Sequence, residues 1–249
     1  NLIFLHVLFI AIAAYFRPIY CIFGFYFFLN FYSKLHLTKN FFYYLIFNVI
    51  LSAPAFYFIV ILDQNEWFRT WFFRTNNITT FSLALSVLFF YSLPFIFYNF
   101  NKLKLININK KIIFFSIIYL ITLSINFSYI APYSGGIFYK SSRLLFSNNY
   151  LFYFIAFLSF YFFLLISKNL TNKRKNFFDL ILFILLIFIE VDGRIYHEAY
   201  DPLFYILSFL FIKNTLYSET IKNLSFKSIN ILFIFTFSFL IMSAIKIYI

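Results

Sequence analysis

The sequence has little charge, and most of the charge that it has is positive. Of its 249 residues only 11% are Asp, Glu, Lys or Arg, whereas 63% are hydrophobic and 27% aromatic. About a quarter of a typical soluble domain is charged. A soluble fold of this length needs a polar surface, which this composition cannot supply. We therefore expect an all-α integral membrane protein that is surrounded largely by lipid.

Cysteine, histidine and acidic residues are also scarce. The single cysteine, Cys21, excludes an intrachain disulfide and lies in an apolar run, as a buried small side chain does. The three histidines, His6, His36 and His197, lack the spacing of a zinc site. The sequence contains no Walker motif, Rossmann fingerprint or Ser-His-Asp arrangement. No cofactor is therefore evident from the sequence.

Long apolar runs predict a bundle of transmembrane helices. Nine runs are candidates, at 2–15, 18–32, 41–62, 77–99, 112–131, 149–167, 177–190, 202–213 and 229–246. Several are short, so the prediction is about seven to nine spans in one membrane domain covering residues 1–249. The sequence begins with Asn1, and its sole methionine is Met242, so we expect further residues before Asn1.

The loops between these runs alternate in charge. Lysine-rich loops are predicted to be cytoplasmic; they lie at 33–40, 100–111, 168–176 and 214–228. The remaining loops are predicted to be non-cytoplasmic; they lie at 63–76, 132–148 and 190–201. The net charge of +12 comes from short loops of this kind, which are typical of anchoring to anionic membrane lipid rather than of binding nucleic acid.

The outer loops contain the side chains expected of a site for a phosphate- or sugar-bearing ligand. Residues 190–201, EVDGRIYHEAYD, hold four of the eight acidic residues. Cations bind phosphate, whereas carboxylates and hydroxyls bond to sugar hydroxyls. The candidate substrate-binding residues are Lys140, Ser141, Arg143, Asp192, Arg194, Tyr196, His197 and Glu198. The alternative is that the acidic residues form a solvated loop with no ligand.

Two of these loops resemble segments of a known enzyme family. Gly135–Ser142 reads GGIFYKSS, and residues 148–154 read NNYLFYF. Together they resemble a segment of the dolichyl-phosphate-glucose alpha-1,2-glucosyltransferases, members of the GT-C class, with the match at Lys140, Ser141 and Ser142. DGRIY at 192–196 resembles the family's D-N-R-H-Y, and the RTN at 74–76 resembles its R-Q-T-N. The family's Gly-Asp before the lysine is Phe-Tyr here, and its histidine after the serines is Arg143.

The resemblance implies transfer of a sugar from a polyprenyl-phosphate donor on the non-cytoplasmic face of a bacterial inner membrane or of the endoplasmic reticulum. It implies an acidic base in an early outer loop, which would precede Asn1; Asp63 is the alternative within the chain. It also implies that cations or a divalent metal stabilise the leaving phosphate. Two other functions stay open: a lipid-linked saccharide transporter or polymerase, and a non-catalytic membrane subunit.

Overall fold

The computed structural model describes residues 2–16, 20, 22–35, 38–57, 77–98, 109–129, 135–171, 177–189, 197–210 and 225–248. All regular structure within these ranges is helical, with no strand among them, as the composition predicts. The helices are α1 (Leu2–Phe16), α2 (Ile22–Leu35), α3 (Lys39–Tyr57), α5 (Asn77–Tyr98), α6 (Lys110–Asn126), α7 (Gly136–Phe146), α8 (Tyr150–Thr171), α9 (Phe177–Ile187), α10 (His197–Leu210) and α12 (Phe226–Tyr248).

Each of the nine apolar runs overlaps one of these helices, and two features depart most from the prediction. The stretch 132–148, predicted to be a loop, contains α7. Its buried positions, Gly136, Tyr139 and Ser142, have helical spacing, but they do not form an apolar run. Helix α10 begins at His197, before the predicted 202, because Tyr200 and Phe204 lie one turn apart and are both fully buried.

Helix α5 forms the centre of the structure. It packs against α6, α7, α8, α9, α10 and α12. Its residues Leu83, Leu88 and Phe95 have no exposed surface, and neither do the serines Ser82 and Ser86. Each serine hydroxyl donates a hydrogen bond to a carbonyl of its own helix, so burial leaves it satisfied. Small residues four positions apart let neighbouring helices approach closely.

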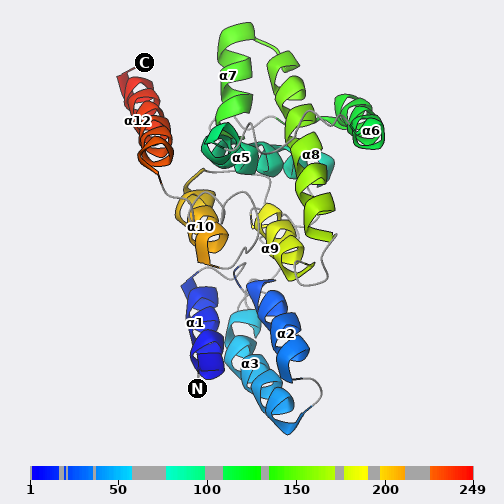
Figure 1. Ribbon diagram of the computed structural model, residues 1–249, viewed down its shortest axis with the longest axis vertical. Coiled ribbons are helices and arrows are strands. Elements are labelled where there is room, and N and C mark those ends of the chain that lie inside the picture. Colours follow the sequence, from blue (N-terminus) through cyan, green and yellow to red (C-terminus); the bar gives the residue numbers. More distant parts are fainter. Residues whose placement is uncertain are drawn as a thin grey trace.

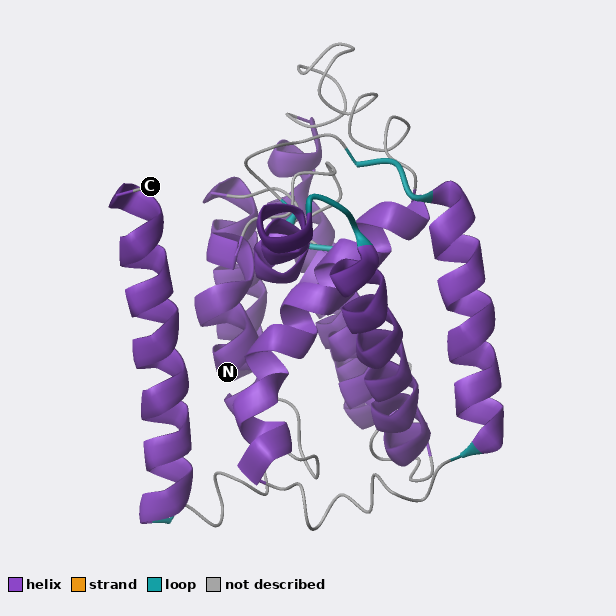
Figure 2. Cartoon of the chain, turned by 90° about the horizontal axis from the view of Figure 1, so that it is seen from above, coloured by secondary structure: helices purple, strands orange, loops and turns teal. Residues whose placement is uncertain are grey.

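The helices follow one another in three groups along the long axis of the molecule. Helices α1, α2 and α3 form a group at one end, α5 to α8 lie at the other, and α9 and α10 lie between them (Figure 1). Seen from the perpendicular direction, α6 and α12 stand upright on opposite flanks (Figure 2).

Many large apolar side chains point away from the protein. On α12, Phe233 and Ile234 are 67% and 65% exposed, and on α6, Ile125 is 77% exposed. Within the described residues, two helical segments are long and apolar enough to cross a membrane, Ile78–Tyr98 and Tyr150–Lys168. Shorter apolar segments lie at Lys39–Leu51 and Ile229–Ile241.

Candidate functional site

The candidate site lies where the start of α7 meets α5 and the start of α10. Two glycines make this contact. Gly135 and Gly136 have φ angles of 102° and 79°, in a region that other residues adopt only with strain. A Cβ atom on Gly136 would lie 2.7 Å from Cγ2 of Val87 and 3.8 Å from Nε2 of His197. The Gly-Gly pair therefore both turns the chain into α7 and lets the backbone approach α5.

His197 connects the three helices through its two ring nitrogens. The backbone N–H of Ile137 donates to His197 Nε2 at 2.7 Å. This N–H belongs to the first turn of α7, where no carbonyl of the helix itself can accept it. On the other side of the ring, Nδ1 lies 3.1 Å from the hydroxyl of Tyr91. Residues distant in sequence are thereby held together by one imidazole.

These contacts determine which nitrogen carries the proton. Because an amide N–H is only a donor, Nε2 of His197 must be the acceptor, and the ring proton must lie on Nδ1. The Nδ1–H group then donates to the oxygen of Tyr91, whose own hydroxyl donates to the backbone carbonyl of His197 at 3.4 Å. The imidazole is therefore neutral in this arrangement, with both nitrogens hydrogen-bonded.

Aromatic rings enclose the imidazole. Phe90 of α5 and Phe239 of α12 lie 5.6 and 5.8 Å from its centre. Tyr91 stacks on Phe204 of α10 with 5.9 Å between ring centres. The hydrogen bonds of His197 therefore lie in largely apolar surroundings, where water competes with them less than at an exposed surface.

Asp201 lies one turn after His197 on α10. Partial burial raises the pKa of its carboxyl above the ordinary value. The carboxylate is close enough to Tyr91 and Tyr205 to interact electrostatically with both phenols. The last acidic residue of the EVDGRIYHEAYD stretch is thus directed toward the helix interface and is not fully solvated.

The other end of α7 is fixed by Ser142. Its hydroxyl donates to the carbonyl of Asn148 at 2.8 Å and accepts the N–H of Phe152 at 3.2 Å. The side chain of Asn148 accepts the N–H of Tyr150 at 3.1 Å and so caps α8. Ser142, which belongs to the resemblance, therefore stabilises the corner between α7 and α8.

The predicted site residues have different surroundings. Lys140 and Ser141 are half-buried on α7, Arg143 is exposed on the same helix, and His197 is half-buried. Glu198 is the second residue of α10. The remaining candidates, Asp63, Asp192, Arg194 and Tyr196, lie outside the described residues. The structure therefore joins the GGIFYKSS segment to the residue that directly follows DGRIY, a pairing across 60 positions of sequence.

Tyr91 was not predicted from the sequence. It lies inside the apolar run VLFFYSLPF, where a tyrosine is as typical of packing as of a site. The nearby Ser86 and Ser92 are the only local sign that this run faces protein. Among the described residues, no group of three His, Cys, Asp or Glu side chains could hold a metal ion.

No family model, curated protein or solved structure matches this chain.

Proposed function

We propose that this protein is a multi-span membrane glycosyltransferase that moves a sugar from a lipid-phosphate donor to an acceptor on the non-cytoplasmic face. The main support is the hydrogen bond between Ile137 and His197. The family resemblance selects two short segments of the sequence, 135–142 and 192–196. The bond joins Ile137, near the start of segment 135–142, to His197, which directly follows segment 192–196.

The exposed apolar side chains support a membrane location for this protein. Soluble monomers rarely expose large continuous apolar surfaces. Here, apolar residues on the outer side of α12 recur at helical spacing, at Phe226, Ile229, Phe233, Phe237 and Leu240, and all are more than half exposed. Lipid solvates such a surface, whereas water does not.

The proposed reaction breaks the bond between the sugar's anomeric carbon and a phosphate oxygen of the donor. A bond forms between that carbon and the acceptor's hydroxyl oxygen, and the acceptor's proton passes to a carboxylate base. The electron pair of the broken bond leaves with the polyprenyl phosphate. Lys140, Arg143 and Arg194 would stabilise that negative charge, which grows in the transition state. Asp192 and Glu198 would accept hydrogen bonds from sugar hydroxyls, and Tyr196 would stack on the ligand or on the guanidinium of Arg194.

The test is transfer of a radiolabelled sugar by the full-length protein in membranes, with polyprenyl-phosphate-linked sugars as donors. We expect Arg194→Ala to lower turnover by about a hundredfold, on the order of the effect of losing one stabilising donor. Lys39→Ala is the matched control, because Lys39 is exposed on α3, a helix outside the site. Both variants should accumulate normally.

Equal and normal turnover by the two variants would remove Arg194 from the mechanism. If the protein instead moved the lipid-linked sugar across vesicle membranes without transferring it, the proposed reaction would be wrong and a transporter would be favoured.

A further inference from the structure

The turn between α7 and α8 exposes a group of large apolar side chains. Leu144, Leu145 and Phe146, in the last turn of α7, are 83%, 71% and 56% exposed. Tyr150, the first residue of α8, is 75% exposed. We call these four residues the apolar corner. Consecutive large apolar residues are seldom left in contact with water unless they bind something, so the corner points to a partner.

Hydrogen bonds hold the apolar corner in a defined conformation. Helix α7 ends at Ser147, whose φ angle of 55° lies in the left-handed region and whose N–H donates to the carbonyl of Arg143 at 3.0 Å. The hydroxyl of Ser142 bonds both to Asn148 and to Phe152. These bonds fix the last turn of α7 beside the start of α8. The exposure of the corner therefore belongs to the packed structure.

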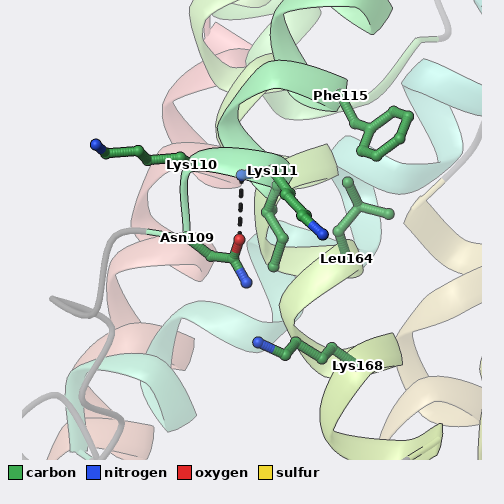
Figure 3. Close-up of a pocket in the computed structure, with 7 residues that line it drawn as sticks. Asn109, Lys110, Lys111, Phe115, Leu164 and Lys168 are labelled. Atoms are coloured by element: carbon green, nitrogen blue, oxygen red, sulfur yellow. Dashed lines mark hydrogen bonds between the residues drawn. The ribbon is translucent and has the colours of Figure 1, made fainter.

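The position of the corner along α8 indicates what covers it. The segment Tyr150–Lys168 is apolar enough to cross a membrane, and its 19 residues extend ~28 Å at the α-helical rise, close to the hydrocarbon thickness of a bilayer. Lys168 ends this segment and lines one pocket together with Lys110 and Lys111 from the start of α6 (Figure 3). Lysines are typical of a membrane boundary. The opposite boundary therefore lies at Tyr150, within the apolar corner.

Helix α7 has the orientation of a helix at such a boundary. It runs along the long axis of the molecule in Figure 1. In Figure 2, where α6 and α12 stand upright, α7 is seen nearly end-on, close to the level of their upper ends. It therefore lies crosswise to the upright helices. Its 11 residues are also too few to cross a membrane. Both features are typical of an interfacial helix.

The side chains beside the corner fit a lipid surface. Residues 136–146 include Lys140 and Arg143 but no acidic residue, which favours contact with lipid phosphates. Arg143 directly precedes the exposed leucines, so a cation borders the apolar group. Tyr150 is of the residue type that gathers at membrane interfaces. One turn further along α8, Phe154 is 59% exposed, so the exposed apolar surface continues from the corner onto the candidate span.

We propose that the apolar corner is inserted into the bilayer at one membrane boundary. Lipid acyl chains cover Leu144, Leu145 and Phe146, and lipid phosphates lie beside Arg143. Helix α7 is then held at its start by protein, through His197, and at its end by lipid. This inference rests on the proposed membrane location, but not on the proposed reaction.

The test measures the depth of fluorescent labels on the full chain in phosphatidylcholine vesicles. Cys21→Ser removes the native thiol, and Leu145→Cys carries the label. Phe237→Cys, on the exposed face at the middle of α12, is the control for a deep position, and Thr38→Cys, exposed just before α3, is the control for water. Leu144→Cys provides a second label at the corner. Helical circular dichroism shows that each variant retains the fold.

We expect the label at Leu145→Cys to be quenched severalfold more than that at Thr38→Cys by lipids with a nitroxide near the glycerol end of the acyl chain. Iodide, which stays in water, should quench the two labels in the reverse order. The label at Phe237→Cys should be quenched most by lipids with the nitroxide near the methyl end of the chain. The reason is that each quencher acts only on labels at its own depth.

Two results would overturn the proposal. Iodide quenching at Leu144→Cys and Leu145→Cys as strong as at Thr38→Cys would place the corner in water. Protection of both labels from iodide and from nitroxide lipids alike would show that protein, such as a second copy of this chain, covers the corner. If Phe237→Cys also escaped every nitroxide lipid, the membrane location itself would be wrong. Sugar transfer does not enter this measurement, so the proposed reaction and the inserted corner can fail separately.

Discussion

Helices α5 and α12 have similar length and composition but opposite surroundings. They contain 22 and 23 residues and are both strongly apolar. Most described side chains of α5 are buried, whereas most of those of α12 are exposed. The difference lies in the polar positions. Ser82 of α5 accepts a hydrogen bond from Tyr119 of α6, whereas Ser238 of α12 donates to the carbonyl of Phe235 in its own helix and is exposed.

This contrast shows that apolar composition predicts a helix but does not distinguish a helix packed inside the protein from one exposed at its surface. Close helix contacts are marked instead by small residues and by polar groups that need partners. At the α5–α7 contact the small residue is Gly136, and at the α7–α10 contact the polar group is His197. The predictions below disturb the close contacts of α5 and the exposed surface of α12, beginning with the largest expected effect.

The largest effect is expected from Gly136→Ala. The positive φ costs an alanine about 1–2 kcal/mol, and overpacking against Val87 costs about 1–3 kcal/mol more. Gly24→Ala is the matched control, because its Cβ would meet nothing closer than the side-chain nitrogen of Asn48 at 3.7 Å. In the helix α2, alanine should stabilise by about 0.5–1 kcal/mol. Melting temperatures in detergent should therefore move in opposite directions.

The strain and the overpacking at Gly136 can be separated. Val87→Ala removes the methyl group that the new Cβ would meet, so the double variant should be less destabilised than the sum of the single variants. If Gly136→Ala melted like Gly24→Ala, α7 would not pack against α5 as described.

The second prediction concerns the exposed face of α12. A lysine at a lipid-facing position near the middle of a span costs about 2.5–3.5 kcal/mol in insertion. Phe237 is more than half exposed at the middle of α12, so Phe237→Lys should reduce the fraction of protein that inserts into membranes, measured by resistance to carbonate extraction. Phe226→Lys is the control, since Phe226 begins the helix and a lysine there can extend to the interface. Equal insertion of the two variants would contradict a lipid-facing α12.

The positions of most helices follow from the sequence. Helix α7 and the contacts between helices do not, for physical reasons. Apolar runs predict all nine long segments because burial and lipid both select the same side chains. They cannot predict α7, whose buried positions are a glycine, a tyrosine and a serine. They also cannot show that His197 contacts Tyr91 and Ile137, because those contacts join positions 106 and 60 residues apart. The candidate binding residues were found from the charge of the outer loops and from the resemblance. Four of the eight predicted substrate-binding residues have described surroundings: Lys140, Ser141, Arg143 and His197.

The smallest loss of stability is expected from substitutions of His197 and Tyr91, which join α7 and α10 to α5. His197→Ala leaves the N–H of Ile137 and the hydroxyl of Tyr91 without the imidazole between them, at a cost of about 1–3 kcal/mol for a buried group that stays unsatisfied. Tyr91→Phe removes only the bond to Nδ1 and to the His197 carbonyl, so it should cost about 1 kcal/mol.

The two variants should also differ in how α7 is held. Loss of the imidazole releases the first turn of α7, whereas loss of the phenol leaves the Ile137 bond in place. Arg143 is exposed on α7 and can report this difference through tryptic cleavage. Cleavage after Arg143 should be faster in His197→Ala than in Tyr91→Phe or in the unaltered protein, because local opening of α7 exposes the chain to protease. If His197→Ala cleaved no faster than Tyr91→Phe, the bond from Ile137 to His197 would not anchor α7, and the main support for joining the two resemblance segments would be lost.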